Sequence, residues 1–200
     1  MPMKPGGRAL GIAESYRRDH SHDSTSDRDR STLAGAVVRA DCVVDGLAYE
    51  HCRVGGTDAT DSVDSLLETV ARPDVQYVLL GAIAPAWYNF FDLERIHEAA
   101  ARPVIAVTFE SSSGLESGLR DAFSGTELRQ RLAVYRRLPS RTELTVNGET
   151  VYARYLGCDR DEAVSVLRAF TPDGGRPEPL RVARLAARAG DSYADTIGDE

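Results

Sequence analysis

The first quarter of the chain alternates short apolar runs with polar or turn-forming segments. Residues 8–13, 33–39 and 42–49 are rich in the aliphatic and β-branched residues that favour strands. We therefore expect an antiparallel meander of three strands. The segment 19–31, which contains no apolar residue, is predicted to be a mobile polar loop that adds nothing to the core.

After residue 57 the pattern changes to helices alternating with buried strands. The apolar residues of 63–70 recur on one helical face, and Asp58 precedes them as a candidate cap. The nearly unbroken apolar run 75–83 is typical of a parallel strand covered on both faces. A helix over 92–101 and a second buried strand over 103–109 follow. The predicted core is thus an α/β, mixed five-stranded sheet: a three-stranded meander, then helix, strand, helix, strand. This is the order of the ribonuclease H fold.

The second half of the chain predicts peripheral additions to this core. Two helices are expected over 115–123 and 128–138. Asn147 and Gly148 lie between two alternating runs, a pattern that predicts a peripheral hairpin. Two C-terminal helices follow, the last of which opens at Pro-Glu-Pro and is expected to stop near Gly190. Residues 191–200 are predicted to be a frayed tail.

Length and composition favour one cytoplasmic domain over residues 1–200. No stretch approaches the roughly 20 apolar residues that cross a bilayer, and the first residues do not resemble a secretory signal. No membrane partner is therefore expected. The three cysteines form no CxxC pair, which argues against both a disulfide framework and a zinc site.

The charge pattern limits how the protein can meet nucleic acid. The net charge is −7, so a phosphate backbone is repelled overall and any contact must rely on a local basic patch or a metal ion. Lys4 is the only lysine, and acidic residues outnumber the cations. This composition favours a salt-adapted protein, although a GC-rich genome also replaces lysine by arginine.

Six segments resemble an archaeal family called domain of unknown function 99. They are RALGIAES, GGTDAT, YVLLGAIAP, YNFFDL, RPVIAV and GGRPEPLRVARLAA, of which YNFFDL and GGRPEPLR are the more specific. That family is related to endonuclease V, a ribonuclease H-like enzyme that cuts deaminated nucleic acid. The resemblance implies the same core strand order. It also implies one carboxylate on the first strand and another at the end of the fourth, holding Mg²⁺ for phosphodiester hydrolysis.

The chain departs from the family at both of these positions. The family motif LGIDD reads LGIAE here, which places Ala13 and Glu14 where the two acids stand. The family motif LDGI reads LGAI, which places Gly81 at the fourth-strand acid. Glu14 is no simple substitute unless the strand ends or bulges there, because neighbouring strand residues point to opposite faces. We therefore expect no resident metal and lean toward a protein that is not an enzyme.

The remaining acids leave an alternative open. Asp58 precedes one predicted helix and Asp92 the next, so helix capping is the favoured interpretation of both. Glu110 follows the fifth strand and reads as a solvated loop acid. In the alternative, Glu14, Asp58 and Glu110 form a displaced site that binds Mg²⁺ or Mn²⁺ and makes the protein a metal-dependent nuclease.

The best candidate for ligand binding is the aromatic segment after the central strand. Open α/β sheets place ligand crevices at this point. Trp87 and Tyr88 can stack on a base, Asn89 can bond its edge, and Asp92 closes the segment. The structural alternative makes Phe90 and Phe91 core residues and Trp87 a loop anchor.

The last helix carries a row of arginines that can contact phosphates. Arg181, Arg184 and Arg188 share one face, and Arg176 extends the row toward the N-terminus. The alternative is a solvated face that pairs with surface acids.

The leading hypothesis is an endonuclease V-like protein that is not catalytic and binds nucleic acid or a nucleotide. The displaced metal-dependent nuclease is one rival. A protein-protein interaction module is the other, because a fold does not determine a function.

Overall fold

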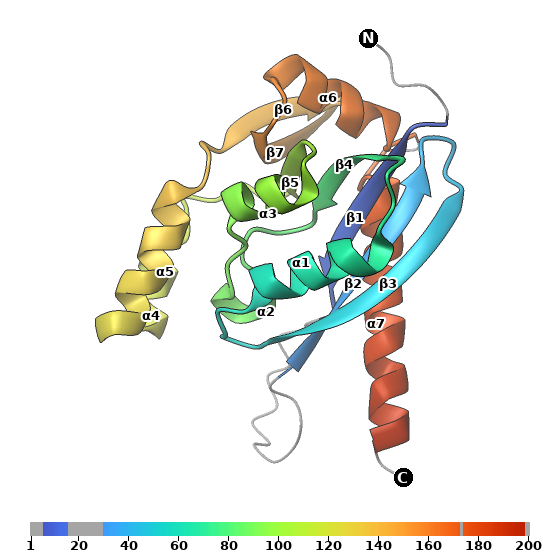
Figure 1. The fold of residues 1–200 in the computed structure, drawn as a ribbon. Helices are drawn as coiled ribbons and strands as arrows, with labels where there is room; N and C mark the ends of the chain where they lie inside the picture. The colour runs from blue at the N-terminus through green and yellow to red at the C-terminus, as the bar shows by residue number, and fades with distance from the viewer. Residues whose placement is uncertain (1–5, 16–29, 173, 199–200) are drawn as a thin grey trace.

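The computed structural model describes residues 6–15, 30–172 and 174–198, and Figure 1 shows their arrangement. In this described part, seven strands form one sheet in the order β3-β2-β1-β4-β5-β7-β6. The strands are β1 (Arg8–Glu14), β2 (Arg30–Arg39), β3 (Val44–Arg53), β4 (Val75–Leu80), β5 (Val104–Thr108), β6 (Thr142–Val146) and β7 (Glu149–Leu156). The helices are α1 (Ala59–Val70), α2 (Pro85–Tyr88), α3 (Leu93–Ala100), α4 (Glu116–Ala122), α5 (Gly125–Arg137), α6 (Arg160–Ala169) and α7 (Glu178–Gly198).

The predicted meander and the parallel centre of the sheet are present. β1 pairs antiparallel with β2 and parallel with β4, and β4 pairs parallel with β5. The sheet is larger than predicted, with seven strands instead of five. The hairpin of β6 and β7 is not peripheral, because β7 pairs antiparallel with β5 from Val104↔Leu156 to Thr108↔Tyr152. This pairing satisfies the backbone groups of β5, which would otherwise be an edge strand.

Two predicted irregular segments are shorter than expected. Arg30 and Ser31 belong to β2, and the rest of the predicted loop 19–31 lies outside the described residues. At the other end, α7 continues to Gly198 where a frayed tail was predicted. Thr32 donates a hydrogen bond to Asp191 at 3.0 Å, which ties this part of α7 to β2. Gly190 therefore lies within the helix and does not end it.

The helices cover both faces of the sheet. Figure 1 shows α1 and α3 on one face and the long helix α7 running along β1 and β2 on the other, where α6 also lies. Successive residues of β1 point alternately to these layers: Leu10 and Ile12 pack in the cluster that includes α1 and α3, whereas Ala9 packs in the cluster that includes α6 and α7. No helix in the described ranges is long and apolar enough to span a membrane.

The close approach of α7 to β1 depends on Gly11. A Cβ atom at this position would lie 2.3 Å from the carbonyl carbon of Pro179 and 2.6 Å from its Cβ. Any larger residue would push the start of α7 away from the sheet. The motif segments that contain Gly11 and Pro179 are therefore in direct contact.

The helices α4 and α5 form a pair that projects from the sheet (Figure 1). They attach through a cluster of Phe90, Leu119 and Leu132. This places α5 beside the aromatic segment that follows β4.

Candidate functional site

The carboxyl end of β1 carries a partly buried acid. Glu14 accepts a hydrogen bond from the backbone N–H of Ala86 at 2.6 Å and one from the Ser31 hydroxyl at 3.4 Å. Burial raises the pKa of Glu14 to about 7, although these hydrogen bonds and the charge of Arg184 oppose the shift. Burial and the charges of Glu14 and Asp58 also raise the pKa of the Cys52 thiol to about 12, so a neutral thiol lies near both carboxylates.

Glu14 supports an unusual backbone turn. Ala86, Trp87 and Tyr88 in α2 all have left-handed φ angles, of 45°, 57° and 64°. Side chains with a Cβ rarely adopt this conformation, and three in succession require support from outside. The bond from Ala86 N–H to Glu14 and a 2.7 Å bond from Gly55 N–H to the Ala86 carbonyl supply it. The turn leaves Trp87 36% exposed.

Asn89 has a structural role in this turn. It is fully buried. Its side-chain amide donates to the Arg53 carbonyl at 2.8 Å and to Asp58 at 2.7 Å, and its oxygen accepts from Ala59 N–H at 2.9 Å. Asn89 therefore caps α1 from a distant part of the chain. Its polar atoms are committed to the protein and do not face a ligand, which corrects the interpretation that it reads a base.

The acids predicted to be helix caps have different roles. Asp58 occupies the cap position of α1, but its carboxylate makes no capping bond and instead accepts from Arg53 N–H at 3.1 Å. Asp92 does cap α3, accepting from Arg95 N–H at 3.3 Å, and it pairs with Arg137 at 2.9 Å. The capping interpretation is confirmed for Asp92 and is wrong for the Asp58 side chain.

Ala13 and Gly81, the residues expected from the motif comparison at the positions of the two family acids, lie side by side. Gly81 N–H donates to the Ile12 carbonyl at 3.0 Å, and a Cβ at Gly81 would lie 3.7 Å from the Ala13 Cβ and 3.8 Å from Leu180 of α7. Ala13 packs against the small apolar cluster that contains Ala183. The described side chains in these contacts are apolar and supply no carboxylate oxygen for Mg²⁺.

The alternative acid cluster is not assembled. Glu14 and Asp58 lie on the α1 side of the sheet and are hydrogen-bonded to protein groups, whereas Glu110 is exposed beyond β5. Among the described residues, no three His, Cys, Asp or Glu side chains are close enough together to hold a metal ion. The side chains of the described part therefore do not fit the magnesium site of the nuclease fold.

In the described part of the chain, the guanidinium groups of three arginines near this edge form no close ion pair. Arg30 and Arg53 are directly opposite each other on β2 and β3, and both are exposed. Arg184 is near enough to Glu14 to lower its pKa. Within the described ranges, no carboxylate oxygen lies within 4.0 Å of any of the three guanidinium groups.

Two other arginines of the predicted row make local contacts. Arg181 pairs with Glu178 at 2.5 Å, and Arg176 lies 4.6 Å above the ring of Phe109. Arg184 is the member of the row whose charge lowers the pKa of Glu14. The sequence pattern missed Arg30 and Arg53, because their juxtaposition depends on the register of two strands.

A buried arginine holds the aromatic residues in place. Arg131 of α5 donates to the carbonyls of Gly55 and Gly56, and its guanidinium lies 3.9 Å from the centre of the Phe123 ring. The ring of Phe123 is in turn 5.1 Å from that of Trp87. Trp87 is thus anchored on one side, as the structural alternative predicted, while a third of it stays exposed.

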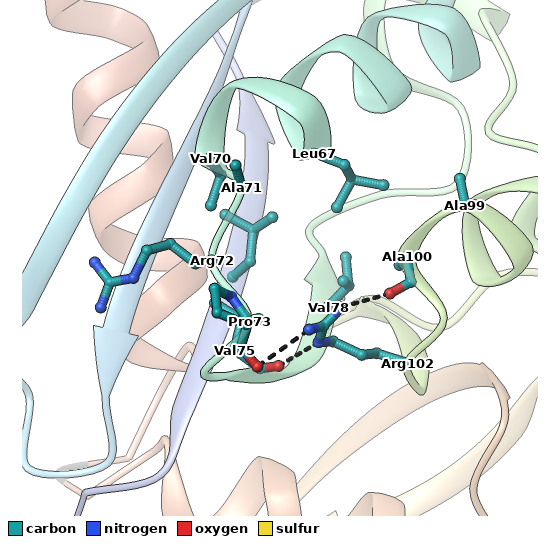
Figure 2. Close-up of a pocket in the computed structure, with 11 residues that line it drawn as sticks. Leu67, Val70, Ala71, Arg72, Pro73, Val75, Val78, Ala99, Ala100 and Arg102 are labelled. Carbon is teal, nitrogen blue, oxygen red and sulfur yellow. Dashed lines mark hydrogen bonds between the residues drawn. The ribbon is translucent and has the colours of Figure 1, made fainter.

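A separate pocket lies at the opposite edge of the sheet, where β4 begins. The pocket has a volume of about 200 Å³. Figure 2 shows Val75 and Val78 among the residues that line it. Arg102 at its mouth donates to the carbonyls of Val75, Ala100 and Pro73. These bonds make the arginine part of the wall, and the pocket is separate from the Glu14 site.

Comparison with known proteins identifies the family. Residues 5–190 match the model of a family described as endonuclease dU. The chain belongs to this family. The UPF0215 protein of Pyrobaculum aerophilum is 32% identical over 190 residues, covering 94% of this chain and 97% of that protein. The UPF0215 protein of Thermococcus kodakarensis is 30% identical, covering 94% and 93%.

Solved structures show that this endonuclease dU family member has the fold of endonuclease V. A protein of unknown function from Archaeoglobus fulgidus superposes with a TM-score of 0.72 at 23% identity, covering 91% of this chain and 96% of that one. Endonuclease V of Ciona intestinalis, in complex with DNA containing an inosine, superposes with a TM-score of 0.58 at 12% identity, covering 94% and 86%. The predicted relationship to endonuclease V is confirmed, as a likeness of fold.

Proposed function

We propose that this endonuclease dU family member binds nucleic acid at the carboxyl edge of its sheet and does not cleave it with a metal at the endonuclease V position. The observation that carries the proposal is the apolar contact of Ala13, Gly81 and Leu180 where that position would need carboxylates. The family description and the inosine-containing DNA bound by Ciona endonuclease V favour nucleic acid with a deaminated base as the partner.

The charges at this edge support binding of a phosphate backbone. The chain as a whole carries −7, so a phosphate is attracted only where local positive charge exceeds negative. Arg30, Arg53 and Arg184 are the candidates for such a patch, because among the described residues no carboxylate oxygen lies within 4.0 Å of their guanidinium groups. The two acids at the same edge are Asp58, which accepts from the backbone N–H of Arg53, and Glu14, whose pKa burial raises to about 7. Guanidinium groups match phosphate geometry with two parallel hydrogen bonds.

Trp87 supports base stacking next to these charges. A Cβ at Gly55 would lie 2.8 Å from the Trp87 ring, so this ring lies beside the turn that follows Arg53. Phe123 and Tyr88 hold the ring, and 36% of Trp87 remains exposed. A base that stacks on an exposed aromatic ring gains affinity without sequence preference.

The proposal predicts that Arg53→Gln combined with Arg184→Gln weakens binding of a single-stranded DNA that contains deoxyuridine. We expect affinity to fall by about 10- to 100-fold and the dependence of log K on log salt to lose about two slope units. Fluorescence anisotropy of the labelled DNA at several KCl concentrations measures both.

The matched control is Arg168→Gln, which removes an exposed arginine of α6 that has no carboxylate partner in the described part of the chain. It should bind like the wild type. Equal affinities for the wild type and the Arg53/Arg184 variant would contradict the proposed site.

A further inference from the structure

A second group of arginines lies across the β6–β7 pair, away from Glu14. Arg154 belongs to β7 and is opposite Ala106 of β5. Arg141 immediately precedes β6, and the pairing of Thr142 with Ala153 places it next to Arg154 across the two strands. Like charges directly opposite each other destabilise a sheet unless another charge compensates them.

Neutral groups hold Arg141 in position. It donates to the carbonyl oxygens of Ser112 at 3.2 Å and Glu110 at 2.5 Å, and to the Thr108 hydroxyl at 3.4 Å. Its guanidinium lies 3.9 Å from the centre of the Tyr152 ring. These contacts orient the cation at the end of β5 without cancelling its charge.

Arg154 is also held by neutral groups. It donates to the Pro139 carbonyl and lies 5.6 Å from the centre of the Tyr135 ring. Its Nε is buried and has no hydrogen-bond partner in the described part of the chain. Burial lowers the pKa of Arg154, and the neighbouring charge of Arg141 lowers it further.

No acid of the described residues forms an ion pair with Arg141 or Arg154. Within the described residues, no carboxylate oxygen comes within 4.0 Å of Arg141 or Arg154, although acids outnumber cations in the whole chain. Two oriented guanidinium groups with unbalanced charge are the arrangement that binds a phosphate.

We infer that Arg141 and Arg154 form a phosphate-binding site. This assignment rests on the proposed function. The two arginines bind a phosphate of the same nucleic acid whose base stacks on Trp87. The two places are connected, because Tyr135 beside Arg154 also contacts Phe90, with 5.8 Å between ring centres, and Phe90 belongs to the aromatic segment. Arg154 is two residues before Leu156 on β7, so it points to the sheet face that carries α1, where Leu156 packs.

The test uses inorganic phosphate as the first probe. Phosphate added to the full chain at constant ionic strength should raise the unfolding temperature of the wild type and of Arg168→Gln, because it binds the folded state only. The increase should disappear in Arg141→Gln and in the double variant with Arg154→Gln. The single variant, in which the Arg154 stem stays in place, keeps the test valid if the double variant does not fold.

The second probe is the deoxyuridine DNA, with and without a 5′-phosphate. Arg141→Gln should weaken its binding by about tenfold and reduce the salt slope by about one unit. A wild-type preference for the 5′-phosphate that this variant abolishes assigns the site to a terminal phosphate. Equal weakening of both DNAs assigns it to a backbone phosphate.

The outcomes separate this site from the proposed function. If DNA does not bind but phosphate stabilises the chain through Arg141, the proposed function fails and the anion site stands. If DNA binds, phosphate does not stabilise the chain and Arg141→Gln binds DNA like the wild type, the anion site is overturned.

Discussion

Replacing Gly11 by alanine is expected to destabilise the protein by about 3 kcal/mol or more. The new Cβ would overlap the backbone of Pro179, at 2.3 Å from two of its atoms. Neither partner can yield easily, because β1 lies between β2 and β4 and Pro179 is in the first turn of α7. The unfolding temperature should fall by roughly 10 °C for a domain of this size.

Thermal unfolding followed by circular dichroism measures this change. Gly46→Ala is the matched control, because Gly46 also lies in a strand but a Cβ there would meet only Val37, at 4.0 Å. We expect the control to unfold within a few degrees of the wild type. If Gly11→Ala does the same, the close contact of α7 with β1 is wrong.

Replacing Glu14 by glutamine is expected to change how stability depends on pH. The pKa of Glu14 rises from its ordinary 4.5 to about 7 on folding, so between these values the folded state binds more protons than the unfolded state. The contribution of Glu14 to the free energy of unfolding is therefore fully present below pH 4.5 and is lost as the pH rises through about 7. The shift corresponds to about 3 kcal/mol, an upper bound.

The glutamine variant keeps an oxygen that can accept from Ala86 N–H but never ionises. It should therefore be more stable than the wild type at about pH 8, by about 1–3 kcal/mol, and lose most of the difference at about pH 4. Denaturant unfolding at several pH values measures this. Glu110→Gln, which removes an exposed carboxyl, serves as the control and should follow the wild type. A wild type whose stability rises steadily from pH 4.5 to 7 relative to the Glu14 variant would contradict the burial of this acid.

The sequence pattern predicted the parts of the fold that depend on local periodicity. The meander, the parallel strands and the order of helices follow from alternating and unbroken apolar runs. The joining of the hairpin to β5 was not predictable, because a two-residue turn specifies a hairpin but not the strand beside it. The extension of α7 past Gly190 depends on its tertiary contact with β2 through Thr32.

The sequence predicted which acids the candidate site lacks, but it did not predict most of the contacts that form the site. Ala13 and Gly81 could be compared with the family motifs, and their adjacency follows from the pairing of β1 with β4. The left-handed turn at Trp87 has no glycine to signal it, and its support comes from Glu14, far away in the sequence. Asn89 looked available for a ligand, because its three partners belong to a distant turn.

The two pairs of neighbouring arginines could not be predicted from the sequence either. Arg30 and Arg53 are opposite each other only because of the register of β2 and β3. Arg141 and Arg154 meet only because of the register of β6 and β7. Sequence patterns predict which face a strand residue occupies but not which residue faces it on the next strand, so clusters of charge across strands need the structure.

Binding without a metal-dependent cut is tested by measuring deoxyuridine DNA binding and cleavage by the full chain, once with EDTA and once with Mn²⁺. We expect the DNA to bind with the same affinity in both, the Trp87 fluorescence to change on binding, and the strand to remain intact. Binding that requires Mn²⁺, or Mn²⁺-dependent cleavage that is lost in Glu14→Gln, would contradict this expectation.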